Sequence, residues 1–163
     1  MKINFKKLFL KQVQLDETIA LNHNITYQST RQRRTLALFV ELGELANATR
    51  CFKYWSNKPS EAKEIVMDEY ADGLHFLISL GIDAGVKRYT YEQFETEQDL
   101  SELFLEMYDK TTRFAKTRKF KEYKVLFETY LKIASRLNMT KKDIFDSYLL
   151  KLGENHHRQQ TNY

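Results

Sequence analysis

Two carboxylates interrupt an otherwise apolar helical stretch near the middle of the sequence. Between positions 36 and 46 the only charged residues are Glu41 and Glu44, which stand among leucine, phenylalanine and valine. Residues three apart project from the same side of a helix, and a helix that is apolar nearly all round is normally buried. A buried carboxylate without a partner is costly, so each must meet a cation or take up a proton. The fold of this chain has to meet that requirement.

A second stretch of the chain repeats the pattern. Glu69 and Asp72 are again three residues apart, and between positions 70 and 82 the only acid or histidine side chains are those of Asp72 and His75. If the two helices pack antiparallel across the short connection 56–60, the two acidic pairs can face one another. Carboxylate oxygens suit Mg²⁺, which is usually shared with substrate phosphates. The doubled pattern therefore predicts a Mg²⁺ site made of four carboxylates.

Two other interpretations of the acidic residues stay open at this point. The acids can lie on the surface of amphipathic helices or pair with cations such as Arg33 and Arg34. A di-iron carboxylate bundle is the second alternative, because Asp72 and His75 form one acid-x-x-His unit. Such bundles use two of these units, and Asn47 stands where the second histidine would be. The Mg²⁺ site accounts for both acidic pairs and is the prediction that we carry forward.

Glycine and proline, which end helices and shape turns, are scarce: 163 residues contain 5 glycines and 1 proline. Apolar residues at helical spacing then predict an all-α helical bundle in a single domain, residues 1–163. Ser60 and Thr140 are the expected N-caps of two helices. We expect a looser aromatic segment at 87–98 and helices at about 4–22, 31–54, 60–83, 100–115, 120–137 and 140–158.

The composition also limits the class of protein. A single cysteine, Cys51, excludes an intramolecular disulfide, and the first residues turn polar too soon for a signal peptide. No apolar run approaches the roughly 20 residues that span a bilayer. We therefore expect a cytoplasmic protein with no membrane partner. The net charge of +4 fits a phosphate-bearing ligand. The basic run "RFAKTRKFKEYK" leaves a non-enzymatic helical protein that binds nucleic acid as a remote alternative, but we expect no nucleic-acid partner.

The sequence segments around the acidic pairs resemble those of a known protein family. The segments "VELGELANATRCFKYWSNKPS" and "DEYADGLHFLISLGI", together with the C-terminal "KLGENHHRQQTNY", resemble the dimeric dUTPases of bacteria and their phages. These enzymes belong to the MazG-like superfamily of all-α nucleoside triphosphate pyrophosphohydrolases. The resemblance implies a Mg²⁺-dependent dUTP diphosphatase that forms a homodimer and converts dUTP, with dUDP as a further substrate, to dUMP. The same chemistry on another nucleoside triphosphate is the alternative.

The resemblance also assigns residues to the metal and the phosphates. The four acids would be metal ligands, with Glu44 or Glu41 as the general base and Glu44 preferred. At the C-terminus, Lys151, Asn155, Arg158 and Tyr163 would bind phosphate oxygens, and the first three share a helical face. Asn162 replaces a glycine that usually precedes the tyrosine, and asparagine also tolerates the left-handed conformation. Lys53 is a further candidate phosphate ligand or a solvated helix end.

Base recognition is assigned to four residues. The segment "LKQVQLDETI" resembles the first motif of the family and offers Gln12 and Asp16, which share a helical face, although many members have asparagine where Asp16 stands. Trp55 continues the helical stripe of Glu41 and Glu44, so it would stack on the base or else belong to the core. Phe76 follows Glu69 and Asp72 in the same way. We expect His75 to be a structural, hydrogen-bonding histidine.

Overall fold

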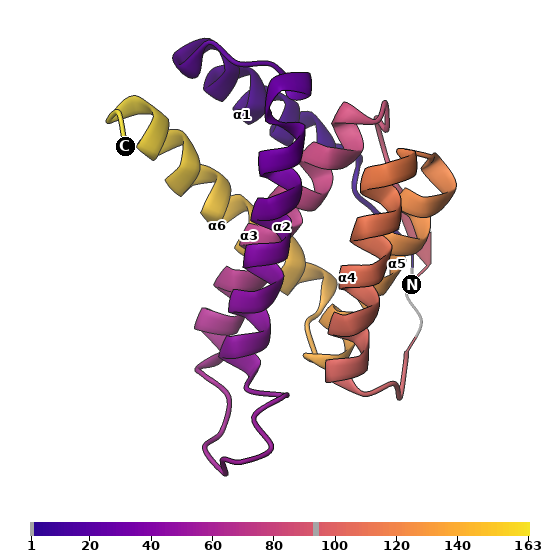
Figure 1. Ribbon diagram of the computed structural model, residues 1–163. Coiled ribbons are helices and arrows are strands. Elements are labelled where there is room, and N and C mark those ends of the chain that lie inside the picture. The colour runs from indigo at the N-terminus through magenta and orange to yellow at the C-terminus, as the bar shows by residue number, and fades with distance from the viewer. Residues whose placement is uncertain (1, 93–94) are drawn as a thin grey trace.

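Helices dominate the structure, a computed structural model that describes residues 2–92 and 95–163 (Figure 1). Over those residues, six helices and two short strands follow one another as β1 Lys2–Asn4, α1 Lys6–His23, α2 Tyr27–Thr49, α3 Lys63–Asp83, β2 Thr90–Glu92, α4 Leu100–Thr117, α5 Phe120–Arg136 and α6 Lys141–Gln160. The two strands form an antiparallel pair in which Ile3 lies opposite Tyr91. The predicted all-α fold class is confirmed. No helix within the described residues is long and apolar enough to cross a membrane.

Helix α3 is the central element of the bundle. It packs against α1, α2 and α6, while α4 and α5 pair with each other at one side (Figure 1). Most side chains in the second half of α3 are apolar and buried, which fits its enclosure by neighbouring helices. Helices α2 and α3 run antiparallel: Arg34 near the start of α2 donates to the Ser79 carbonyl near the end of α3 at 3.3 Å. The arrangement that brings the two acidic pairs face to face is therefore present.

Two tyrosines of α5 fit against glycines of α3. The Tyr130 hydroxyl donates to the Tyr70 carbonyl at 2.6 Å, and a Cβ added at Gly73 would lie 2.3 Å from that hydroxyl oxygen. Tyr123 takes the same position against Gly81, where an added Cβ would also lie 2.3 Å from the hydroxyl oxygen. Both phenol groups are fully buried. The glycines thus permit a close approach of α5 to α3, the helix that carries Glu69 and Asp72.

One acidic residue at the end of α3 gathers three arginines. Asp83 has a side chain that is 5% exposed, and its carboxylate lies 2.8 Å from Arg31, 2.9 Å from Arg34 and 3.2 Å from Arg118. These ion pairs tie the start of α2 and the α4–α5 turn to α3. Part of the basic run that suggested nucleic-acid binding, Arg118, therefore has a partner inside the fold.

The bounds of α2 differ from the prediction at both ends. The helix begins at Tyr27 because the Thr26 side chain accepts a hydrogen bond from the Ser29 backbone N–H at 3.1 Å, a cap that we did not predict. It ends at Thr49, not at residue 54, because Arg50 adopts a left-handed φ of 60°. The residues after Arg50 therefore lie outside the helix.

The start of α3 was also predicted wrongly. Its N-cap is Ala62 and not Ser60, since the Glu61 backbone N–H donates to the Ala48 carbonyl at 2.9 Å and holds the chain against the end of α2. The Thr140 cap of α6 is confirmed by the hydrogen bond from the Asp143 N–H to its side chain. The expected loose segment 87–98 contains strand β2, and its residues 93–94 lie outside the described part of the chain.

Candidate active site

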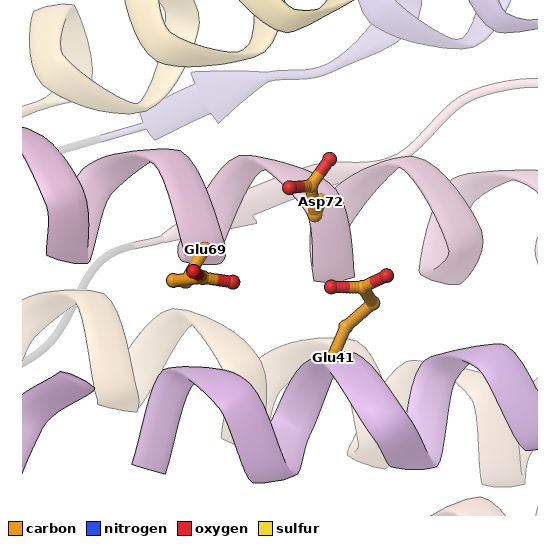
Figure 2. Close-up of side chains that lie close together, drawn as sticks. All are labelled: Glu41, Glu69 and Asp72. Atoms are coloured by element: carbon orange, nitrogen blue, oxygen red, sulfur yellow. The ribbon is translucent and has the colours of Figure 1, made fainter. Parts of the chain in front are cut away.

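Three of the four predicted carboxylates come together between α2 and α3. Glu41 projects from α2 toward Glu69 and Asp72, which are carried by α3 (Figure 2). One carboxylate oxygen from each residue lies within 4.8 Å of the others. Such an oxygen-only donor set fits a hard divalent cation such as Mg²⁺, which binds carboxylates and water. We call Glu41, Glu69 and Asp72 the carboxylate cluster.

Glu44, the fourth predicted carboxylate, lies beside the carboxylate cluster. Its side chain is exposed on α2 and acts to raise the pKa of the neighbouring Glu41 carboxyl. Glu44 is outside the group of three whose oxygens lie within 4.8 Å of one another.

The surroundings of the cluster favour the protonated acids. Burial and the charge of Asp72, together with the hydrogen bond and charge of Glu44, raise the pKa of Glu41 to about 8. Burial and the Glu44 charge also raise the pKa of Glu69, and burial raises that of Asp72 although Lys151 opposes the change. A bound cation would reverse this effect, because it stabilises the ionised carboxylates.

A lysine of α6 lies against the acidic residues. The Nζ of Lys151 lies 2.8 Å from Asp68 and 2.9 Å from Asp72, and the side chain is 4% exposed. Burial disfavours the charged lysine, but its hydrogen bonds to Asp68 and Asp72 outweigh burial and raise its pKa. Asp68 was missed in the sequence analysis. Its position four residues before Asp72, on the same side of α3, was the available signal.

The carboxylate cluster opens into a cleft of about 1020 Å³ between α1, α2, α3 and α6. A cleft of this size lies at the upper end of the range for small-molecule sites. Most of the predicted site residues line it: Gln12, Asp16, Glu41, Glu44, Glu69, Asp72, Phe76, Lys151, Asn155, Arg158 and Tyr163. The fold thus brings segments from both ends of the chain to one site.

The end of α6 presents cationic and polar groups to this cleft. Lys151, Asn155 and Arg158 line it together, which confirms that they share one helical face. Arg158 is exposed, and its guanidinium carbon lies 5.0 Å from the centre of the Tyr163 ring. Asn162 has the expected left-handed conformation, with a φ of 52°, and so turns the chain between them. The guanidinium thus lies at the cleft, where its Nη1 donates to Asn155 Oδ1 at 3.5 Å.

Two predicted site residues lie elsewhere in this chain. Trp55 and Lys53 follow the end of α2, so the helical stripe that linked Trp55 to Glu41 does not exist. Trp55 is 64% exposed and packs edge-to-face on Tyr54, with ring centres 5.1 Å apart. Neither residue lines the cleft. The physical reason is that α2 ends early, at a left-handed Arg50. No glycine or proline stands at this position in the sequence to indicate a helix end.

The opposite end of the cleft carries a hydrogen-bonded network. Gln12 Nε2 lies 2.9 Å from Asp16 Oδ1, which confirms that these residues share a face of α1. The hydroxyls of Tyr27 and Ser79, which were not predicted, donate to Asp16 Oδ2 at 3.0 Å and 2.9 Å. His75 contacts Gln12 at 2.7 Å and is a hydrogen-bonding histidine, as expected.

Comparison with known proteins identifies the family. A protein-family model described as dUTPase matches residues 4–163, which is nearly the whole chain. A search of curated proteins found no match. The matched range contains the carboxylate cluster and the α6 residues that face it. The chain therefore belongs to the all-α dimeric dUTPase family and is a dUTP diphosphatase, a metal-dependent hydrolase that converts dUTP to dUMP.

Proposed function

We propose that this dUTPase uses Mg²⁺ held by Glu41, Glu69 and Asp72, with the triphosphate of dUTP lying between these acids and α6. The observation that carries the proposal is the meeting of three carboxylate oxygens within 4.8 Å in a cleft that also contains Lys151 and Arg158. When bound, Mg²⁺ would offset phosphate charge and make water more acidic. Triphosphates need both an oxygen-ligated cation and positive side chains, and this cleft offers both.

We assign the proton transfer to Glu44. It lies next to the carboxylate cluster, is exposed, and is outside the group of three that would hold the cation. A carboxylate in that position can accept the proton of an attacking water, a role that Glu41 would lose once its oxygens bind a cation. Glu41 then contributes as a ligand of the cation.

The phosphates would be held from α6. Arg158 has exposed guanidinium donors for two phosphate oxygens, with Asn155 and Tyr163 beside it. Lys151 is paired with Asp68 and Asp72 in the free protein, so its contact with phosphate requires an exchange of partners. Lys53 is dropped from this set because it lies outside the cleft.

The base would bind at the other end of the cleft. Gln12, Asp16 and Phe76 line this end, where Asp16 is surrounded by polar donors and Phe76 offers an apolar ring. Trp55 is not proposed to stack on the base within one chain. Activity on dUDP follows from the same phosphate site, because the cluster and Arg158 do not require a third phosphate group.

We further propose that the chain is one domain that works as a homodimer in the cytoplasm. Leu36 and Val40 on the outer side of α2 are 63% and 49% exposed, which gives this helix an apolar strip next to the site. A second copy would cover such a strip. Light scattering at micromolar concentration tests the assembly, and a monomer would contradict it.

The decisive experiment combines a substrate panel with site variants. With Mg²⁺, we expect hydrolysis of dUTP and dUDP to exceed that of dCTP, dTTP and ribonucleotides. Glu44→Gln and Asp72→Asn should lower the rate of hydrolysis at least about a thousandfold while they still unfold cooperatively. Glu44→Gln removes the proposed proton acceptor, and Asp72→Asn removes a proposed metal ligand. Glu97→Gln is the matched control, since the Glu97 side chain is 98% exposed. Equal turnover of all nucleotides, or retained turnover in both variants, would refute the proposal.

A further inference from the structure

The polar network at the base end of the cleft contains a buried histidine that the proposed chemistry does not use. His75 is 4% exposed, Gln12 is 3% exposed and Tyr148 is fully buried. The His75 ring stacks on the Tyr148 ring with centres 3.9 Å apart. Gln12 stands between His75 and Asp16, and Asp16 in turn lines the cleft. The directions of these hydrogen bonds restrict where protons can be.

The first restriction comes from the backbone of α6. His75 Nε2 lies 3.2 Å from the Tyr148 carbonyl oxygen, and a carbonyl oxygen can only accept. Nε2 therefore carries a hydrogen. In a neutral imidazole the other nitrogen, Nδ1, then has no hydrogen and must itself accept one. The group that faces Nδ1 at 2.7 Å is the side-chain amide of Gln12.

This amide has two orientations of nearly equal shape, with oxygen and nitrogen exchanged. With Oε1 toward Nδ1, His75 has to carry a second proton, and the amide nitrogen donates to an ionised Asp16. With the amide turned over, its nitrogen donates to a neutral His75, and its oxygen faces Asp16 Oδ1 across 2.9 Å. Two oxygens at that distance need a hydrogen between them, so Asp16 must then be protonated. Both states hold the same number of protons.

The turned orientation also satisfies the remaining groups. Gln12 has a second amide hydrogen, which finds Tyr148 Oη at 2.7 Å, and the Tyr148 hydroxyl can donate to the Leu8 carbonyl at 3.3 Å. Tyr27 and Ser79 donate to Oδ2 of Asp16 in either state. Every polar hydrogen of the network then has an acceptor without a buried charge.

Burial of both groups favours this neutral state. Burial lowers the pKa of His75 to about 4, and Lys151 and His156 on α6 act in the same direction. Burial raises the pKa of Asp16, although the hydrogen bonds of Gln12, Ser79 and Tyr27 and the charge of Arg34 oppose it.

The cation that faces Asp16 from α2 is already paired. Arg34 lies 2.9 Å from Asp83 and donates to the Tyr27 carbonyl at 2.6 Å. Among the described residues, the ion pairs do not include Asp16. Glu17, on the same helix as Asp16, acts to raise the pKa of Tyr27.

We propose that Gln12 couples the protonation of Asp16 to that of His75, so that the free enzyme holds Asp16 as a neutral carboxylic acid and His75 as a neutral positioning residue that fixes the Gln12 amide. The identity of the ligand at this end of the cleft rests on the proposed function, whereas the protonation states of Asp16 and His75 do not. A neutral acid lacks the negative charge with which a carboxylate would repel the carbonyl oxygens of a pyrimidine. The network thereby decides which base edges the cleft tolerates.

The test uses the full-length protein without nucleotide, labelled with ¹⁵N in histidine and ¹³C in the aspartate carboxyl groups. Between pH 8 and pH 5 we expect NMR spectra of a neutral His75 with its hydrogen on Nε2, and an Asp16 carboxyl that remains protonated at pH 7. An imidazolium at His75, or an ionised Asp16, at pH 7 would overturn the proposal. Because no nucleotide is present, a failure to hydrolyse dUTP leaves this result unaffected.

Two variants separate coupling from a merely structural role. Gln12→Glu places an acceptor opposite Nδ1, so the proton affinity of His75 should rise at least about tenfold, or one pH unit. Asp16→Asn imitates the protonated acid, so the tautomer of His75 should stay unchanged and unfolding should stay cooperative. If Gln12→Glu does not fold, Asp16→Asn still decides, because a shift of His75 to the imidazolium in that variant contradicts the proposal.

Discussion

The stability of the metal-free enzyme should depend on pH through Glu41. Its folded pKa of about 8 lies well above the ordinary value of 4.5. A tenfold change in proton affinity corresponds to about 1.4 kcal/mol, so this gap is worth at most about 5 kcal/mol. Because the side chain is partly exposed, solvent screening reduces the expected effect to about 2 kcal/mol.

The sign follows from proton uptake by the folded state. Below pH 4.5 Glu41 is protonated both folded and unfolded, and its full contribution to stability is present. Between 4.5 and about 8 the unfolded chain releases the proton first, so the free energy of unfolding falls as the pH rises. Above pH 8 the loss is complete. Glu69 and Asp72, whose pKa values are also raised, should add to the loss in the same direction.

Urea unfolding with a chelator at pH 4.5, 6, 7 and 8.5 measures this effect. Glu41→Gln cannot ionise, so it should match the wild type at pH 4.5 and exceed its free energy of unfolding by about 2 kcal/mol at pH 8.5. Glu97→Gln, at a fully exposed acid, should follow the wild-type curve. Added Mg²⁺ should remove the advantage of Glu41→Gln. A wild-type curve that is flat with pH, or a Glu41→Gln curve parallel to it, would refute the reasoning.

Two further changes test the packing and the charges around the site. Gly73→Ala should lower the free energy of unfolding in urea by about 2 kcal/mol, because its Cβ would meet the Tyr130 hydroxyl. Gly153→Ala, where an added Cβ would have nothing within 4 Å, should raise the free energy of unfolding by about 0.5 to 1 kcal/mol. Equal effects of the two substitutions would contradict the close approach of Tyr130 to Gly73. Lys151→Met should destabilise the metal-free enzyme by about 2 kcal/mol because it leaves Asp72 unpaired, and Mg²⁺ should restore part of the loss; no change in urea would contradict this role.

The sequence predicted those parts of the fold that depend on local chemistry. Helices α4, α5 and α6 were found nearly at their bounds because their apolar spacing and the Thr140 cap are local signals. The end of α2 was missed because a non-glycine residue, Arg50, adopts the left-handed conformation there. The strands were missed because each has three residues and forms only by pairing with a segment far along the chain. Long-range contacts of this kind leave no periodic pattern.

The same division holds for the site. The acids could be found because a charge inside an apolar stretch is an anomaly that the sequence itself displays. The helical stripe that placed Trp55 beside Glu41 depended on a longer α2, and it is absent because the helix ends at Thr49. The contact of Gln12 with His75 joins residues 63 positions apart in the sequence. Burial and the neighbouring residues in the fold determine which of the two side chains donates the hydrogen, and the sequence alone does not show these surroundings.

In the proposed mechanism Lys151 would contact both the acidic residues and the phosphates. Its ammonium shares Asp72 with the carboxylate cluster, so a divalent cation bound by the cluster competes with it for the same carboxylate. Two like charges about 4 Å apart at a protein surface repel each other by about 4 kcal/mol, which is more than the stabilisation that a single exposed hydrogen bond contributes. Negative phosphate oxygens in the cleft offer the displaced ammonium another partner, with Arg158 on the same helical face. The salt bridge of the free protein and the phosphate contact that we propose for the working enzyme would then be alternative positions of one side chain, so Lys151→Met should weaken both metal-free stability and substrate binding.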